Sequence, residues 1–308
     1  MKSALKSILA VATVLGLVQP IRAAEAVAKL SIGIQRVEAT EAVTRGVEKA
    51  GPDKLLSLQR IAESMGQQLI DRVHGTRKFT VVSRSDLNTV LKEQDLQRVL
   101  GDPNDANVAQ AFKMAGCQYA LIVTIDDFQD LAEELRAEGG QVLARKRTIR
   151  LSSVAKIYDT STAKLLESAS FLLSEQDGGK VQFGVAADGK GGEQVLAAMP
   201  REMSDRVANR VMDVIFPAKI LAMTGKLVTI NRGDGTGIAK GQVWTVYATG
   251  EKLVDPDTGE VLGAEEIPVG KVTIVNVTPK FSHGQITEDL GIDKLQVLRI
   301  DAEAKDAR

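Results

Sequence analysis

Residues 119–125 read YALIVTI and decide the fold of the first half of the chain. An uninterrupted apolar and β-branched run of this length is typical of a short strand that is buried on both faces. Such a strand needs helices packed on its sheet, and the sequence before it alternates strand patterns with helix patterns. We therefore predict a layered α/β domain around this strand.

The residues before this strand predict two more strands and three helices. Helix patterns are recognised by apolar residues three and four positions apart, and Gly75 and Gly116 follow two of them as stop signals. Residues 38–52 are polar with two glycines and predict loops. The predicted strands are residues 28–34 and 79–82. The first and third predicted helices are residues 54–73 and 107–114. The second begins at a cap at Ser83 or Ser85 and carries Leu87, Val90, Leu91 and Leu96.

The residues after this strand predict a long antiparallel hairpin. Residues 130–141 are polar and contain a Gly-Gly pair. Residues 146–158 then alternate in polarity, a turn-rich stretch follows, and residues 165–174 form the second strand, so the pair closes the sheet. A glycine-rich loop at residues 177–192 and a last helix at residues 195–215 complete the predicted domain.

After Pro217 the pattern changes to short strands between glycine turns, which predicts a small all-β barrel. The predicted organisation is a signal peptide at 1–24, an α/β domain at 25–216, a β-barrel domain at 217–300 and a charged tail at 301–308. The predicted barrel strands are residues 226–231, 242–248, 270–277, 285–288 and 296–300.

The N-terminus has the order of a secretory signal. Lys2 and Lys6 precede a short apolar run at residues 8–18, and small residues follow, so cleavage is expected after Ala24 or Ala26. Removal of the first 24 residues leaves 36 basic against 40 acidic residues, a mildly acidic chain. We expect a periplasmic or exported protein without a lipid anchor, because the only cysteine is far downstream. No later apolar run is long enough to predict an integral membrane span.

The composition argues against several classes of function. Lys and Arg number 39 against 40 Asp and Glu, so a general nucleic-acid surface is not expected. One Cys and two His leave too few ligands for a zinc site built from these residues, and few partners for a catalytic triad. We therefore expect no metal, no cofactor and no enzymatic activity.

The motifs that resemble chemical sites have simpler interpretations. The glycines of residues 231–237 precede a strand rather than a helix, so they predict a tight turn and not a nucleotide loop. Residues 255–260 lack the ligand spacing of a calcium loop and predict a hairpin turn. Asp126 and Asp127 are adjacent on a strand, so they cannot share a proton and are expected to act as local caps. His74 is expected to cap a helix and Cys117 to lie in the core, with an intermolecular disulfide as the alternative.

Four basic residues of the predicted hairpin are the candidate partner contacts: Arg145, Lys146, Arg147 and Arg150. A cluster of this kind can hold an acidic partner or a phosphate. A solvated strand edge that is protected by charge explains it equally well. Both interpretations stay open at this point.

Two stretches resemble the CsgG family, the curli production assembly/transport component. They are FTVVSRSDLNTVLKEQ at residues 79–94 and AGCQYALIVTIDDF at residues 115–128, and the YDTSTAK turn at residues 158–164 is similar to a hairpin turn of that family. The resemblance covers about residues 28–216. Related envelope proteins share this type of domain, including lipoprotein activators of penicillin-binding proteins and the N-terminal domain of TolB. The resemblance also implies ring oligomerisation.

The second domain is similar to the C-terminal domain of flagellar assembly protein T. The residues that carry this resemblance are GQVWTVY at residues 241–247 and DPDTGEVLG at residues 255–263. The resemblance implies an SH3-like barrel.

Together the two resemblances predict a non-enzymatic envelope protein that acts in assembly or export through protein contacts. The alternatives are an outer-membrane secretion channel of the curli type, a regulator of a cell-wall synthase, and a hydrolase that uses Asp and Glu alone. The chain departs from the channel because it lacks a cysteine near the cleavage zone. It also shows a single long hairpin, with charges spread along it, where a transmembrane barrel needs lipid-facing hairpins.

Overall fold

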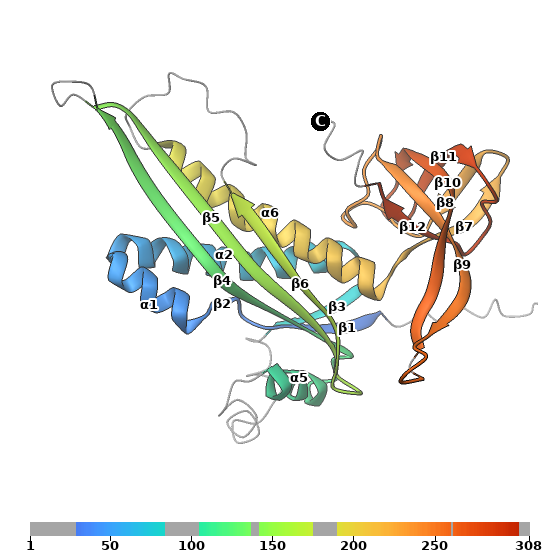
Figure 1. Cartoon of the computed structure of the whole chain (residues 1–308), viewed down its shortest axis with the longest axis horizontal. Coiled ribbons are helices and arrows are strands. Elements are labelled where there is room, and N and C mark those ends of the chain that lie inside the picture. The colour runs from blue at the N-terminus through green and yellow to red at the C-terminus, as the bar shows by residue number, and fades with distance from the viewer. Residues whose placement is uncertain (1–28, 84–104, 137–141, 175–189, 260, 302–308) are drawn as a thin grey trace, which may run out of the picture.

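The computed structural model describes residues 29–83, 105–136, 142–174, 190–259 and 261–301. A mixed α/β part comes first and an all-β part follows it (Figure 1). The predicted signal peptide, the predicted helix after Ser83 and most of the glycine-rich loop at 177–192 lie outside the described residues.

The α/β part is built on a six-stranded sheet with the order β3-β1-β4-β5-β6, and the short β2 pairs with β4. β1 lies parallel to both β3 and β4, whereas β4, β5 and β6 are antiparallel neighbours. The central position of β4 explains the apolar run that it carries. The strands are β1 (Leu30–Ile34), β2 (Glu38–Ala39), β3 (Phe79–Ser83), β4 (Tyr119–Arg136), β5 (Val142–Asp159) and β6 (Lys164–Ser174).

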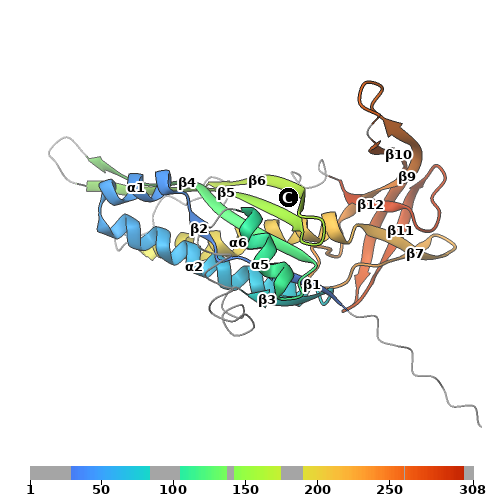
Figure 2. The same cartoon turned by 90° about the horizontal axis from the view of Figure 1, so that it is seen from below.

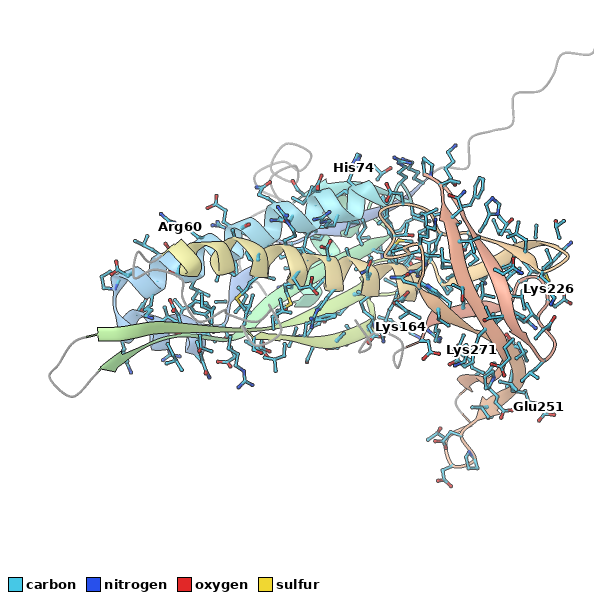
Figure 3. All side chains as sticks on the ribbon, turned by 90° about the horizontal axis from the view of Figure 1, so that it is seen from above. Arg60, His74, Lys164, Lys226, Glu251 and Lys271 are labelled. Atoms are coloured by element: carbon cyan, nitrogen blue, oxygen red, sulfur yellow. The ribbon has the colours of Figure 1, made fainter. Side chains whose placement is uncertain are left out.

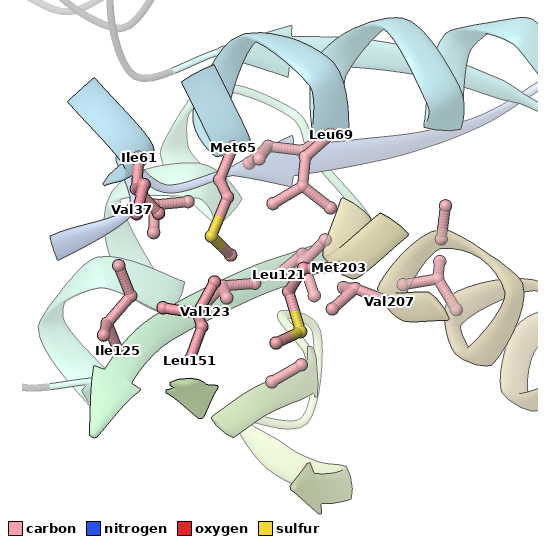
Figure 4. Close-up of a cluster of buried hydrophobic side chains, with 14 of the residues drawn as sticks. Val37, Ile61, Met65, Leu69, Leu121, Val123, Ile125, Leu151, Met203 and Val207 are labelled. Carbon is pink, nitrogen blue, oxygen red and sulfur yellow. The ribbon is translucent and has the colours of Figure 1, made fainter. Parts of the chain in front are cut away.

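Three helices cover one face of this sheet (Figure 3). They are α1 (Glu41–Ala50), α2 (Pro52–Gly75) and α6 (Lys190–Ile215). Leu121 and Val123 of β4 pack against Met65 of α2 and Met203 of α6 in one continuous core (Figure 4). Pro52 is the first residue of α2. Proline is favoured there because a backbone N–H in the first turn has no partner inside the helix.

A fourth helix, α5 (Asp105–Met114), packs on the opposite face of β4. Its Phe112 is fully buried with Ala120 and Ile122, which alternate with the residues that face α2. Cys117 belongs to the same cluster, so its predicted core position is confirmed. The ring of Phe112 lies directly over Gly33 of β1, where a Cβ atom would overlap it.

One predicted loop is wrong, and the strand predicted at residues 119–125 is longer than expected. Residues 38–52 contain β2 and α1, because the Thr40 side chain accepts a hydrogen bond from Val43 N and Val47 is buried. Residues 130–136 continue β4, because they pair with β5 as far as Arg136 opposite Val142. The predicted β5–β6 hairpin is confirmed, but β4 and β5 form a second long antiparallel pair.

In the all-β part, six strands close into a barrel in the order β10-β11-β8-β7-β12-β9. β9 and β10 are longer than predicted and continue as a two-stranded ribbon that projects from the barrel (Figure 2). The first barrel strand, at residues 218–224, was missed because its apolar pattern runs on from the preceding helix. The strands are β7 (Ala218–Thr224), β8 (Leu227–Ile230), β9 (Val243–Val254), β10 (Val261–Val277), β11 (Ser282–Asp289) and β12 (Val297–Ile300).

The barrel and the α/β part touch at the C-terminal end of α6. Phe216, directly after α6, still packs in the α/β core, where its ring meets that of Phe79 edge to face with centroids 5.3 Å apart. Arg77 Nη1 donates to the carbonyl of Pro279 in the barrel at 3.1 Å. No helix within the described ranges is both long and apolar enough to cross a membrane.

Candidate interaction surface

The face of β4, β5 and β6 that turns away from α2 and α6 is the candidate functional site. Side chains alternate along each strand, so every second residue points to this open face. Leu131 of β4 and Leu172 of β6 lie there with 54% and 46% of their side-chain surface exposed. Arg150 of β5 lies between them in the strand order. Large exposed apolar residues beside a cation are typical of a contact surface.

These residues line a shallow hollow of about 350 Å³. Its floor and walls come from all three strands, which places it on the most extensive hydrogen-bonded ladder of the α/β part. A surface built on paired strands keeps its shape better than one built on loops. The lining residues are Gln129, Leu131, Thr148, Arg150, Leu172 and Ser174.

Arg150 has a loose electrostatic partner at the border of the hollow. Its Nε lies 3.7 Å from Oδ2 of Asp127, longer than a hydrogen bond, and Gln129 Nε2 donates to the same carboxylate oxygen at 3.4 Å. The side chain of Arg150 is about half exposed. The Arg150 guanidinium can leave Asp127 and bind an acidic group of a partner at little cost in free energy, because an exposed ion pair at this distance contributes little to stability.

Of the four predicted contact residues, the structure places Arg150 in the hollow. The other three, Arg145, Lys146 and Arg147, lie in β5, where their backbones pair with those of Glu134, Glu133 and Ala132 of β4. The side chains of these three lie outside what the structure describes. Their role as partner contacts stays a prediction.

Behind the hollow, β4 is held to α2 by an ion pair. Lys54 Nζ lies 3.2 Å from Oδ1 of Asp130 and also donates to the Asp130 carbonyl. The Asp130 side chain is 1% exposed, so it faces the helices while its neighbours Gln129 and Leu131 face the hollow. This contact fixes which residues of β4 reach the open face.

The outer boundary of the surface is β6, an edge strand in the sheet order. Arg206 of α6 donates from Nη1 to the Leu172 carbonyl at 3.2 Å, and Arg210 Nη2 lies 2.9 Å from Oε1 of Glu167. Basic side chains from a neighbouring helix thus reach over this edge. Arg206 therefore occupies one backbone carbonyl of this edge strand.

The other predicted sites have structural roles. Asp127 lies beside the hollow, and β4 continues past Asp126 and Asp127, so they do not cap a strand end. His74 lies in the last turn of α2, as predicted, and is exposed. His283 lies in β11, where its Nδ1 is 3.3 Å from the Thr229 hydroxyl. Among the described residues, no cluster of His, Cys, Asp and Glu has the size needed to hold a metal ion.

The carboxylates with a shifted pKa are mostly turn residues. The Ser161 hydroxyl and the Thr162 amide hold the pKa of Asp159 below its usual value, and the Thr258 and Asp257 amides do the same for Asp255. These contacts confirm tight turns after β5 and after β9. Burial raises the pKa of Asp205, although Arg72 lies 2.8 Å away and opposes this effect.

The loop at residues 231–237 has a role that the sequence did not predict. Arg232 is 2% exposed, and its guanidinium contacts α6 rather than a ligand. The glycines allow close approach, because a Cβ at Gly233 would overlap the backbone of Lys280. The only signal for a buried Arg232 in the sequence is its partner Asp213, and a single aspartate in a helix is not a distinctive signal.

Comparison with known proteins adds a family match to this geometry. The family described as curli production assembly/transport component CsgG matches residues 16–168. This span contains β1 to β5 and the first part of β6, and thus most of the open face. The barrel lies outside the match. No curated protein matches the chain.

Several solved structures are similar to this chain at low identity. A hypothetical protein from Chlamydia trachomatis shares 9% identity, with 61% of this chain and 99% of that chain covered and a TM-score of 0.35. The PelC dodecamer from Paraburkholderia phytofirmans shares 9% identity, with 58% and 86% covered and a TM-score of 0.30. TolB from Acinetobacter baumannii shares 10% identity, with 89% and 60% covered and a TM-score of 0.30.

Proposed function

We propose that this protein is a non-enzymatic accessory protein of the cell envelope that works by holding another protein on the open face of β4, β5 and β6. The observation that carries the proposal is the hollow in which the exposed Leu131 and Leu172 flank Arg150. Apolar contact supplies the affinity and the arginine orients the partner. The secretory signal pattern and the CsgG family match support an envelope location.

In this proposal the partner is an envelope or secreted protein with an apolar segment and an acidic group. The barrel, which we expect to be SH3-like, is a second contact module at the other end of α6. No cofactor or nucleic acid is needed for this role. The work is done by complementarity of surface and charge, and the rigid sheet limits the entropy that is lost on binding.

The test is affinity capture from the cell envelope with matched surface variants. Leu131→Ser with Leu172→Ser removes the apolar part of the hollow, and Arg150→Glu reverses its charge. Leu56→Ser and Arg60→Glu are the controls, because both residues are exposed on α2. Figure 3 shows Arg60 on the helical side of the molecule. We expect captured partner to fall at least about tenfold for the hollow variants and to stay unchanged for the controls. Equal capture by all variants would contradict the proposal.

The CsgG match also favours a secretion channel of the curli type as a second candidate. Osmotic shock separates the two. A protein released with the periplasmic fraction supports the accessory role, and one that stays with the outer membrane through a high-salt wash supports the channel. Co-purification of a cell-wall synthase in the capture experiment would identify the regulator among accessory roles.

A further inference from the structure

The edge strand β6 has a sequence that reads nearly the same in both directions. Residues 165–173 are LLESASFLL, which is a palindrome about Ala169 except at Glu167 and Phe171. In an antiparallel pair, each residue before the centre meets the matching residue after the centre. A strand with this sequence therefore meets an equivalent residue at most positions when it pairs with a second copy of itself.

The exposed residues of β6 follow the same symmetry. Leu166 and Leu172 are 44% and 46% exposed. Ser168, Ser170 and Leu172 lie at alternate positions on the open face, and Leu166 is the extra residue of a bulge just before them. Pairing about Ala169 puts Leu166 beside Leu172 of the second copy and Ser168 beside Ser170 of the second copy. Two leucine contacts then enclose a centre of small side chains, which lets the two backbones approach.

The backbone of β6 is oriented for this pairing. The Leu172 carbonyl accepts a hydrogen bond from Arg206, so it points away from β5. Strand backbone groups alternate in direction, so the N–H and C=O groups of Ser168 and Ser170 point outward as well. These are the two residues that meet across the two-fold axis, and in an antiparallel ladder such a pair exchanges both hydrogen bonds.

We propose that two copies of this protein associate by antiparallel pairing of their β6 strands about a two-fold axis at Ala169. The two sheets then join into one continuous sheet, and α6 of each copy lies on the same side of it. The contact is isologous, so it closes after two copies. It does not require the proposed function, although Leu172 belongs both to the β6 contact and to the hollow.

Two features limit the strength of this contact. A bulge lies where Ile157 pairs with Glu167 but Tyr158 pairs with Leu165, so the regular ladder of β6 ends beside Leu166. Arg206 occupies the Leu172 carbonyl and has to leave it when a second strand arrives. Because one short strand buries much less than a standard interface, we expect reversible association with a Kd on the order of 10–100 µM.

Paired charges at positions 168 and 170 test the register itself. Ser168→Lys with Ser170→Lys places like charges opposite each other across the axis, whereas Ser168→Glu with Ser170→Lys places a Glu opposite a Lys at both positions. Both side chains are exposed, so the fold should tolerate either pair. Like charges directly opposite each other weaken a strand pair and opposite charges strengthen it. Thr80→Lys on β3, the strand at the other edge of the sheet, is the control.

Sedimentation velocity of the purified protein from low to high micromolar concentration is the readout. We expect the Lys/Lys variant to weaken self-association by more than about tenfold and the Glu/Lys variant to keep or exceed that of the unchanged protein. A mixture of the Lys/Lys variant with Ser168→Glu/Ser170→Glu should form dimers that neither forms alone. Arg206→Ala should tighten association a few-fold, on the order of 3 to 10, by freeing the Leu172 carbonyl.

A protein that is monomeric over the whole range, with Arg206→Ala also monomeric, would overturn the inference. Equal association by the Lys/Lys and Glu/Lys variants would overturn the register about Ala169. These outcomes are separate from the proposed function, because they are measured on the pure protein. Capture of an envelope partner is tested separately by Leu131→Ser and Arg150→Glu, which lie on β4 and β5 outside the β6 contact.

Discussion

Arg232 Nη2 lies 2.6 Å from Oδ1 of Asp213, and this ion pair joins the barrel to the end of α6. The same nitrogen donates to the Phe216 carbonyl at 3.1 Å, and Arg232 Nη1 donates to the Thr236 carbonyl at 3.2 Å. The guanidinium also lies 5.8 Å from the centroid of the Trp244 ring. A cation at the C-terminus of a helix is stabilised by the carbonyl groups that the helix leaves unpaired.

Replacing Arg232 should loosen the attachment of the barrel. Arg232→Ala leaves the Phe216 and Thr236 carbonyls without this donor, so we expect the free energy of unfolding to fall by about 2–3 kcal/mol. Urea unfolding measures the loss, and limited proteolysis near residue 217 should become faster. Arg299→Ala is the control, because its partner Glu266 is also well exposed and such a pair contributes less than about 1 kcal/mol. Equal losses for both variants would contradict this role.

Gly33 should not tolerate a side chain. Its Cβ would overlap the Phe112 ring, so we expect Gly33→Ala to lower the free energy of unfolding by about 2 kcal/mol. Phe112→Leu in the same chain should recover part of the loss by making room. Gly66→Ala in α2 is the matched control, because no atom lies within 4 Å of the added Cβ and alanine favours a helix by about 1 kcal/mol. Urea unfolding of the three variants gives the comparison.

Ala163, in the turn between β5 and β6, should prefer glycine. Its φ of 56° is left-handed, which costs an alanine more than a glycine. Part of the gain is lost because glycine makes the unfolded chain more flexible, so we expect Ala163→Gly to stabilise the protein by about 0.5 kcal/mol. Ala198→Gly in α6 should instead destabilise it by about 1 kcal/mol. A shift of the urea midpoint in the same direction for both variants would rule out this explanation.

Cys117 should make stability depend on alkaline pH. Burial raises the pKa of its thiol to about 11, above the ordinary value of 9.0. The folded state then holds the proton more tightly than the unfolded state, so this contribution is complete below pH 9 and falls as the pH rises toward 11. Comparison with Cys117→Ala isolates the effect, since the variant lacks this titration. A thiol reagent at pH 8 should react much faster after unfolding, and rapid reaction of the folded protein would contradict the burial.

Much of the fold follows from local patterns. The apolar run at residues 119–125 and the three-and-four spacing in α2 predict β4 and α2, because burial imposes these periods directly. α1 was missed because a short helix with few buried residues has little apolar pattern. The end of β4 was missed because residues 130–136 are polar. Their strand conformation comes from pairing with β5, which local sequence does not specify.

The candidate site was only partly predictable. The basic cluster in the hairpin pointed to Arg150, but Leu131 and Leu172 of the hollow come from strands on either side of β5. Their meeting depends on strand register, which is a property of the whole sheet. Arg232 was read as part of a turn, because its partner Asp213 lies in the preceding domain.

The central claim is that the open face of β4, β5 and β6 holds a partner protein. Its most direct test is a photo-crosslinking side chain placed in living cells at Gln129, Leu131 or, as a control, Arg60 on the helical side. We predict crosslinked adducts of one discrete mass from Gln129 and Leu131 in the envelope fraction, and none of that mass from Arg60. The same adduct from all three positions, or adducts from Arg60 alone, would contradict the account.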